Sequence, residues 1–400
     1  MKKNPLIGKG LAVGIILLFV GTCIVPVIAQ DTEKPLPSSR GNWLYVGGSG
    51  PGNYTKIQDA IDNASKGDTV FVYDDSSPYY ENIKINKKID LIGEDKISTT
   101  IDSNHIGNVA TITASYSSIS GFRIINGGIV PDYGIRVESA RNCSIFNNIL
   151  ENNAFGICLD GWNVPGGMCI DNLIFNNTVR NSKHAAIRLY DGCSGNQVFR
   201  NTVTENGDGI EILSTSNDCF ENNIFENNVK NNREGIALVN SHNNNISRNN
   251  ISNNSYYGIW LDGVTNIIID NIIKGNKLGI IIMGHSRNNL ITKNNITDST
   301  KYGISLEENK ENVISWNNIK NNFIGIRHWM SNNNEITYNI FVNNMINAYF
   351  INGKNIWDSN YWDNLKLIVK PIFGIRFLIL PWVQFDWHPA KQPYDIPGMR

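Results

Sequence analysis

Residues 231–263 read NNREGIALVNSHNNNISRNNISNNSYYGIWLDG, a stretch rich in asparagine in which an aliphatic side chain recurs every few residues. Polar tracts of this composition are often disordered. This one contains the same short pattern twice, however, because a Gly-Ile pair at 235–236 returns at 258–259. The stretch is therefore one repeat and the start of the next.

Two motifs follow this repeat along most of the chain. The first places a small residue before an aliphatic one, at Gly134, Gly156, Ala186, Gly209, Gly235, Gly258, Gly279, Gly303, Gly325 and Ala348. After each small residue, the first and third positions are mostly aliphatic, while the second and fourth vary, which indicates a strand with one buried side. A unit of about 23 residues with short strands and no helical period predicts one rung of a parallel β-helix.

The second motif, aliphatic-x-x-Asn-x-aliphatic, recurs in step with the first. Its asparagines are Asn148, Asn177, Asn201, Asn223, Asn249, Asn271, Asn294, Asn317, Asn339 and Asn360. Equivalent positions of neighbouring rungs lie about 4.8 Å apart, so these amides can hydrogen-bond from rung to rung. We interpret the asparagines as a structural ladder and not as a binding code.

The two ends of the chain depart from the repeat. Residues 1–29 combine early lysines with an apolar run, which predicts a signal peptide, with an uncleaved membrane anchor as the alternative. Residues 30–42 have the composition of a linker. Residues 43–364 are expected to form the β-helix, including a short amphipathic helix near Ile57 and Ile61 as its N-terminal cap. Residues 365–400, rich in Trp and Pro, are expected to form an irregular C-terminal cap.

Composition limits the function classes. Hydrophobic residues make up 41% of the 400, which is enough for a large core, and the net charge of -1 gives no bias toward nucleic acid. We expect no nucleic-acid partner, contact with a membrane only through the N-terminal segment if it stays uncleaved, and a monomer.

The chain resembles a known family in three places. These are the opening NYTKIQDAIDNASKGDTVFVY (53–73) with YYENIKINKKIDLIGEDKISTTID (79–102), the repeats themselves, and the closing NYWDN (360–364) with FDWHPAKQPYDI (385–396). The chain is similar to right-handed parallel β-helix proteins of the NosD-like, carbohydrate-binding and sugar-hydrolase (CASH) type, especially archaeal surface proteins. The resemblance implies an all-β, right-handed parallel β-helix that is secreted or exposed at the cell surface.

The same resemblance leaves three functions open, because such relatives include lyases, hydrolases, epimerases and copper-system proteins. The first is binding of a polysaccharide or glycan. The second is a polysaccharide lyase or hydrolase acting on acidic polysaccharide. The third is a structural or adhesive envelope protein without a small ligand.

A candidate carbohydrate site follows from the positions that face outward. Charged and aromatic residues gather in the early rungs, beside the longest insertion, GWNVPGGMCI at 161–170. The candidate residues are Arg136, Glu138, Asp160, Trp162, His184, Arg188, Tyr190 and Glu211. Arginines would pair with uronate carboxylates, carboxylates could bind Ca²⁺ or act as acid and base, and the aromatic rings would stack on sugars. The competing interpretation is that these charges simply pair across rungs.

The remaining predictions concern single residues. Cys169 and Cys193 are expected to lie on adjacent rungs, within reach of a disulfide. The six histidines fall at different repeat positions, so we expect no metal site and no cofactor other than Ca²⁺. Asn250 and Asn295, each directly after a ladder asparagine in an Asn-x-Ser/Thr motif, are candidate glycosylation sites.

Overall fold

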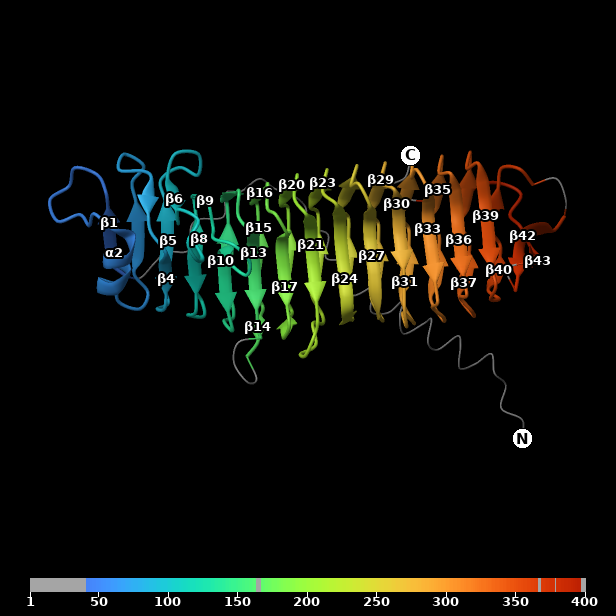
Figure 1. Ribbon diagram of the computed structural model, residues 1–400, viewed down its shortest axis with the longest axis horizontal. Helices are drawn as coiled ribbons and strands as arrows, with labels where there is room; N and C mark the ends of the chain where they lie inside the picture. Colours follow the sequence, from blue (N-terminus) through green and yellow to red (C-terminus); the bar gives the residue numbers. More distant parts are fainter. Residues whose placement is uncertain (1–40, 163–166, 366–367, 378, 397–400) are drawn as a thin grey trace, which may run out of the picture. The chain divides into compact units, whose positions relative to one another are not determined.

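The computed structural model describes residues 41–162, 167–365, 368–377 and 379–396. The expected signal peptide and nearly all of the expected linker lie outside the described residues. The chain divides into two units, Met1–Ser38 and Ser39–Arg400, and every strand belongs to the second. That unit is an all-β, right-handed parallel β-helix, which runs in Figure 1 from β1 to β43.

Each rung contributes one short strand to each of three parallel sheets, and equivalent strands of successive rungs pair in register. The long-strand sheet contains β4 (Ile83–Ile85), β7 (Ala110–Ile112), β10 (Tyr133–Glu138), β13 (Phe155–Asp160), β17 (Ala185–Tyr190), β21 (Asp208–Leu213), β24 (Glu234–His242), β27 (Tyr257–Val264), β30 (Leu278–Ile282), β33 (Tyr302–Glu307), β36 (Ile324–Trp329) and β39 (Ile346–Ile351).

The second sheet follows in chain order within each rung. It contains β1 (Trp43–Val46), β2 (Thr69–Val72), β5 (Asp90–Gly93), β8 (Ser118–Ser120), β11 (Ser144–Phe146), β15 (Leu173–Phe175), β19 (Gln197–Phe199), β22 (Asn223–Phe225), β25 (Asn245–Ser247), β28 (Ile267–Ile269), β31 (Leu290–Thr292), β34 (Val313–Ser315), β37 (Glu335–Thr337) and β40 (Ile356–Asp358).

The third sheet completes the rung before the chain returns to the long-strand sheet. It contains β3 (Tyr79–Tyr80), β6 (Thr100–Asp102), β9 (Arg123–Ile125), β12 (Ile149–Glu151), β16 (Thr178–Arg180), β20 (Thr202–Thr204), β23 (Asn228–Lys230), β26 (Asn250–Ser252), β29 (Ile272–Lys274), β32 (Asn295–Thr297), β35 (Asn318–Lys320), β38 (Ile340–Val342) and β41 (Tyr361–Trp362).

The core is built by the aliphatic positions that define the repeat. On β27, Ile259 and Leu261 are fully buried, while Trp260 and Asp262 between them are partly exposed. The small residue before each aliphatic pair is required by close packing, since a Cβ atom on Gly235 would lie 2.3 Å from the carbonyl oxygen of Gly258 on the next rung. The repeat pattern therefore encodes both the buried side of the strand and the approach of its neighbours.

Asparagines occupy all three corners of the rung, where the sequence pattern had indicated one column. The Asn148 ladder lies between the second and third sheets, and its backbone and side-chain N–H groups donate to the next Oδ1 at 2.9–3.1 Å. Its members are Asn148, Asn177, Asn201, Asn227, Asn249, Asn271, Asn294, Asn317, Asn339 and Asn360. Nine of the ten predicted asparagines are therefore in this ladder.

The tenth prediction, Asn223, is wrong, and the ladder residue of that rung is Asn227. Both positions fit the motif, because an aliphatic or aromatic residue lies three before and two after each of them. The extra residues of this rung form a loop before β22, at 214–218, which moves the ladder position further along the chain, from Asn223 to Asn227. Asn223 begins β22 and is partly exposed.

The second and third ladders differ in continuity. The Asn172 ladder, between the long-strand and second sheets, runs without a break through Asn172, Asn196, Asn222, Asn244, Asn266, Asn289, Asn312, Asn334 and Asn355. The Asn206 ladder, between the third and long-strand sheets, is interrupted by Ser182 and Ser299, whose buried hydroxyl oxygens have no hydrogen-bond partner within the described residues.

The residue before each ladder position supplies the left-handed backbone of the corner. Arg200, Glu226 and Trp316 have φ values of 54°, 56° and 58°, so this position accepts large side chains as well as asparagine. The ladder asparagines are thus selected by hydrogen bonding, because the left-handed backbone conformation falls on the residue before them.

Both ends of the helix are covered. At the front, α2 (Ile57–Asn63) buries Ile57 and Ile61 against the first rungs. At the rear, β42 (Lys370–Arg376) and β43 (Leu380–Asp386) form a regular antiparallel hairpin, so this cap is more ordered than the sequence had indicated. The fully buried Asp386 accepts hydrogen bonds from Asn360 and Trp362 and ends the Asn148 ladder.

The predicted disulfide is absent. Cys169 on β14 (Cys169–Ile170) and Cys193 on β18 (Cys193–Ser194) are direct neighbours in register, but both are free thiols. Their side chains leave paired strands in the same direction, and each thiol donates to a backbone oxygen: Cys169 to that of Val137 at 3.5 Å, and Cys193 to that of Leu159 at 3.4 Å.

Within the described residues, no helix is long and apolar enough to cross a membrane.

Candidate functional site

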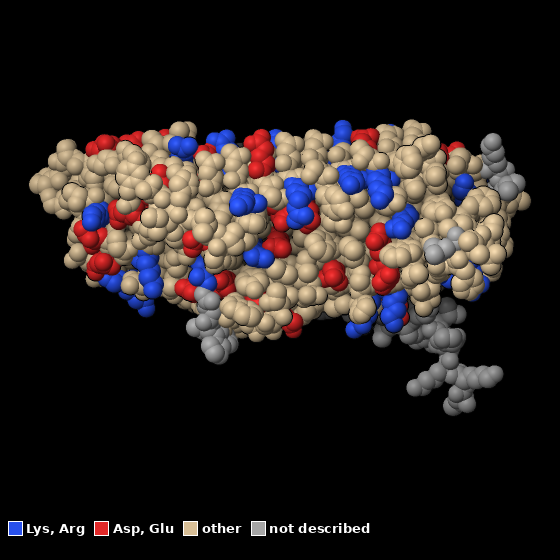
Figure 2. All heavy atoms as spheres, viewed as in Figure 1, with Lys and Arg blue, Asp and Glu red and all other residues tan. Residues whose placement is uncertain are grey.

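The candidate site is the outer side of the long-strand sheet from β10 to β24, called here the β10–β24 face. Its outward positions carry charged and aromatic side chains from five consecutive strands, which lie side by side in Figure 1. In Figure 2, viewed from the same side, acidic and basic side chains lie next to one another near the middle of the molecule. The face is thus rich in charge but has no large area of a single sign.

The first ion pair joins β10 to β13. Arg136 Nη2 lies 2.6 Å from Asp160 Oδ2, and Arg136 Nη1 lies 3.6 Å from Glu138 Oε1. Only 4% of the Asp160 side chain is exposed, and its other oxygen accepts the backbone N–H of Trp162 at 2.9 Å. Asp160 therefore orients Arg136 and the start of the 161–170 insertion, and it has little surface left for a ligand.

The second ion pair joins β17 to β21. Arg188 Nε lies 2.7 Å from Glu211 Oε2, and both side chains are mostly covered. The guanidinium group also lies over the rings of Phe155 and Tyr190, at 5.1 and 4.8 Å from their centroids. Planar guanidinium groups favour this stacking. Arg188 is consequently held in one place by three neighbours.

The third cluster, on β21 and β24, was missed by the sequence reading. Arg233 Nη2 lies 2.8 Å from Asp208 Oδ1 and 3.2 Å from Glu234 Oε1. Burial raises the pKa of Glu234 to about 7, and the neighbouring Asp208 carboxylate adds to this rise. Burial likewise raises the pKa of Glu211 above its ordinary value, despite the opposing charge of Arg188. Two carboxyl groups with raised pKa values therefore lie close together on this face.

Aromatic rings line the same face. Tyr133 and Phe155 lie 5.1 Å apart, and His184 stacks on Phe155 at 5.0 Å. Trp162, 48% exposed, stacks on Tyr190 at 6.1 Å. Tyr133 and Phe155 pack with Ala154, Cys158 and Ala185 into a small apolar cluster that is separate from the core. Tyr133 and Phe155 are buried, so the exposed apolar surface beside the charges comes from Trp162 and, in part, from Tyr190.

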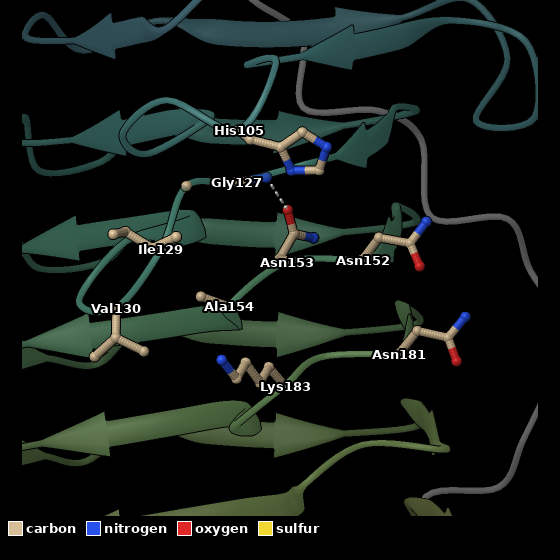
Figure 3. Close-up of a pocket in the computed structure, with 10 residues that line it drawn as sticks. His105, Gly127, Ile129, Val130, Asn152, Asn153, Ala154, Asn181 and Lys183 are labelled. Atoms are coloured by element: carbon tan, nitrogen blue, oxygen red, sulfur yellow. Dashed lines mark hydrogen bonds between the residues drawn. The ribbon is translucent and has the colours of Figure 1, made fainter.

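A pocket adjoins this face at the corner before β10, β13 and β17. Its volume is about 320 Å³, at the lower end of the range of roughly 300 to 1,000 Å³ for ligand pockets. Figure 3 shows its lining, which comprises His105, Gly127, Gly128, Ile129, Val130, Asn152, Asn153, Ala154, Asn181 and Lys183. Ala154 belongs both to the pocket and to the apolar cluster, so the two surfaces are continuous.

The predicted site residues all lie on or beside this one face. Arg136, Glu138, Asp160, Arg188, Tyr190 and Glu211 come from paired strands, with Trp162 and His184 at their ends. Sequence reasoning missed Tyr133, Phe155, Asp208 and Glu234, which precede the small residue of each rung. Because the alternation was counted only after the small residue, this third outward column was overlooked.

The arginines are not free for the role first considered for them. Each arginine of the face is paired with a carboxylate of its own or the next rung, as the competing interpretation expects. A uronate would have to displace a partner that is already desolvated and well placed. These arginines are better suited to neutral parts of a ligand than to its carboxylates.

Metal sites were tested against the same residues. Within the described part of the chain, no group of three or more His, Cys, Asp or Glu side chains could hold a metal ion. The described cysteines are buried free thiols; burial raises the pKa of Cys158 and Cys193 well above its ordinary range, whereas the hydrogen bond with Cys193 lowers the pKa of Cys219. The described residues therefore contain no cluster of His, Cys, Asp and Glu side chains of the kind that binds copper.

Comparison with known protein families identifies the family to which the chain belongs. The family described as periplasmic copper-binding protein (NosD) matches residues 61–230 and 217–374, which together span most of the chain. The protein belongs to this NosD family of β-helix proteins. Since the residues do not fit a copper site, membership shows the fold and the lineage, and the chemistry must come from the site itself.

The individual proteins that match either cover only part of the chain or have low sequence identity to it. The chain is 35% identical over 114 residues to a cell surface glycoprotein of Methanothermus fervidus; the match covers 28% of this chain and 18% of that protein, so the chain spans less than a fifth of this relative. The catalytic unit of a GH87 α-1,3-glucanase from Streptomyces thermodiastaticus is similar in structure, with a TM-score of 0.64, 15% identity, and coverage of 76% of this chain and 67% of the other.

Two further solved structures share the architecture. The surface adhesin PfbA of Streptococcus pneumoniae has a TM-score of 0.58 at 15% identity and covers 84% of this chain and 95% of its own. A mannuronic acid specific family 6 polysaccharide lyase from human gut microbiota has a TM-score of 0.54 at 13% identity, covering 82% and 88%. At such identities these similarities establish the fold alone.

Proposed function

We propose that the protein is exported, remains at the cell surface or is secreted, and binds a polysaccharide or glycan on its β10–β24 face. The observation that carries the proposal is the concentration of different outward residues on five adjacent strands, continuous with a pocket. Stacked rings such as Trp162 and Tyr190 offer sugars a flat apolar surface, and the ordered charges offer hydrogen bonds. The surface-glycoprotein relative and the polysaccharide-active fold neighbours support the same class.

The test is a binding assay of the full chain against a panel of neutral and acidic polysaccharides, with two variants. Arg188→Ala removes a side chain that contacts Phe155, Tyr190 and Glu211, and Asp160→Ala releases Arg136. We expect the wild type to bind at least one polysaccharide and both variants to bind it more weakly. Unchanged binding by both variants would place the site elsewhere.

Catalysis is a second candidate because of one specific feature. Glu234, with a pKa of about 7, can be a neutral acid close to the carboxylates of Asp208 and Glu211. Pairs of carboxyl groups with separated pKa values perform acid–base chemistry on glycosidic bonds. Mass spectrometry of the same polysaccharides after incubation, with and without Ca²⁺, would detect unsaturated or shortened products, and Glu234→Gln should abolish them. Intact polymers would leave binding, or a purely structural or adhesive role, for those substrates.

The two candidate glycosylation sites remain proposals. Asn250 is exposed at the start of β26, and Asn295 is partly exposed at the start of β32. Both amides make weak or replaceable contacts with neighbouring asparagines, at 3.4 Å and 3.0 Å. We expect peptide mapping of the protein from its native host to find the glycan on these two residues.

A further inference from the structure

The pocket beside the β10–β24 face contains polar side chains that the fold does not use. His105, Asn152, Asn181 and Lys183 line it, and none of these side chains has a hydrogen bond or ion pair with a described residue. All four residues are exposed, so water can satisfy their donors and acceptors in the free protein. A ligand in the concavity could therefore use these groups without displacing a protein contact.

Lys183 differs in this respect from the arginines around it. Arg136 and Arg188 are paired on the face, and on the other side of the corner Arg123 and Arg180 both bind Glu151. Asp132, at the rim, places a carboxylate oxygen next to Gly128 but forms no ion pair with Lys183. Lys183 is thus the positive charge in this part of the described surface that can neutralise a ligand without displacing a protein carboxylate.

The pocket also has an apolar and a polar side. Ile129 and Val130, 82% and 49% exposed, form one side, and Figure 3 shows Asn152 and Asn181 on the opposite side with their amides pointing away from these two residues. The ammonium end of Lys183 points toward the side of Val130 in this view. A sugar ring presents the same division, with an apolar face and hydroxyl groups around its edge.

The corner that carries the pocket is one where the internal ladder is interrupted. Ser182, between Asn181 and Lys183, replaces a ladder asparagine, and its buried hydroxyl has no partner among the described residues. In the next rungs the same corner is held by the continuous run from Asn206 to Asn276. The pocket therefore lies where the scaffold lacks a side-chain hydrogen bond that the following rungs have.

We propose that this pocket is a subsite for a uronic acid unit of the glycan, with Lys183 as the counter-ion of its carboxylate. Asn152 and Asn181 would hydrogen-bond its hydroxyl groups, and Ile129 and Val130 would cover its apolar face. The proposal rests on the proposed glycan-binding function, which it makes more specific. It assigns recognition of the acidic group to Lys183 and leaves the paired arginines to contact neutral parts of the polymer.

The experiment uses probes that differ only in charge. Polygalacturonate and mannuronan oligosaccharides, and their fully methyl-esterified forms, would be titrated into the full chain by calorimetry. Wild type should prefer an acid over its ester, and Lys183→Met should lower affinity for the acid about tenfold while changing ester binding little. Lys183→Arg should retain much of the preference.

The matched control is Lys277→Met. Lys277 follows the ladder residue Asn276 as Lys183 follows Ser182, but it lies away from the pocket, over the ring of Tyr256. This variant should bind like the wild type. Equal loss of acid and ester binding in Lys183→Met, or no preference in the wild type, would overturn the subsite alone. Binding of neither probe set nor any other polysaccharide would instead overturn the proposed function and this inference with it.

Discussion

The corners of this β-helix and its β10–β24 face are both columns of stacked side chains, yet they are built in opposite ways. Along the Asn148 ladder every rung has the same residue making the same hydrogen bonds, up to the buried carboxylate of Asp386. On the outer face of the same rungs, Arg136 is followed by Cys158, Arg188 and Glu211.

The difference follows from what each column must satisfy. A corner amide is buried and has to pair with its neighbours, so only a side chain with both a donor and an acceptor fits every rung. The outer positions range from the buried Cys158 to the partly exposed Arg136, and they are restricted mainly by their cross-strand neighbours. Repetition therefore marks the scaffold of this protein, and variation marks the surface available for recognition.

The largest expected effect comes from breaking the ladder. Asn227→Leu would remove the acceptor of the Asn201 backbone N–H and the side-chain donor to the carbonyl of Val198, and it would leave the oxygen of Asn249 with only one of its two donors. We expect this variant to lose about 3–5 kcal/mol of unfolding free energy, since each buried unsatisfied group costs roughly 1–3 kcal/mol.

The neighbouring Asn223 is the matched control for that prediction. Asn223→Leu changes a partly exposed strand residue and should alter stability by no more than about 0.5 kcal/mol. Chemical denaturation of both variants measures the difference. Similar losses in the two would contradict the placement of Asn227, and not Asn223, in the ladder.

The next effect is a pH dependence that arises on the outer face. The pKa of Glu234 is raised from 4.5 to about 7, so the folded protein binds more protons than the unfolded chain between these pH values. Stability should therefore fall as pH rises through this window, by up to the order of 3 kcal/mol at 1.36 kcal/mol per unit. Glu234→Gln should flatten the decline in urea unfolding measured from pH 4.5 to 8.

Glu151 provides a comparison of opposite sign. Burial alone would raise its pKa, but hydrogen bonds and the charges of Arg123 and Arg180 outweigh burial and hold the pKa below its ordinary value. The stability that ionised Glu151 contributes is fully present above the ordinary pKa of a glutamate, and it is lost as pH falls through the lowered pKa of the folded state. Glu151→Gln should thus lower stability at neutral pH and leave the decline caused by Glu234 intact; a flattened decline would refute the assignment.

A smaller effect distinguishes an arginine that contributes to glycan binding from one that contributes only to stability. Arg327 repeats the surroundings of Arg188 further along the sheet, with Glu307 at 2.5 Å and the rings of Tyr302 and Trp329 at 5.3 and 5.8 Å. Both Ala variants should lose about 1 kcal/mol of stability or less, as partly exposed ion pairs do. Arg188→Ala should also weaken glycan binding about tenfold, whereas Arg327→Ala should not. Equal weakening would extend the binding surface beyond β24.

The smallest predicted effect is a gain. Ser182→Asn restores the missing amide of the Asn206 ladder and should raise the free energy of unfolding by about 1 kcal/mol, the net value of a typical hydrogen bond. Ser255→Asn, at an exposed position after a ladder residue, is the control and should have no measurable effect. A thermal unfolding series would show whether Ser182 interrupts the ladder at a cost.

The spacing of small and aliphatic residues was sufficient to predict much of the fold. It placed the strands, the buried positions and nine of the ten ladder asparagines, because each of these depends on contacts that recur in every rung. It failed at Asn223, where two motif matches lie within one rung and only the position of an extra loop distinguishes them. It also missed the other two ladders, because the Asn172 ladder lacks the aliphatic residue three positions before and the Asn206 ladder has an aliphatic residue two positions after in only some rungs.

The same reasoning from the sequence predicted only part of the candidate site. The sequence indicated that outward charges gather in the early rungs, since strand alternation alone assigns those positions. Tertiary structure decided that the arginines are paired, that Asp160 is covered, that Cys169 and Cys193 remain separate thiols, and that Lys183 lies unpaired at a pocket. Each of these depends on side-chain directions between residues far apart in the chain, and a local repeat does not encode them.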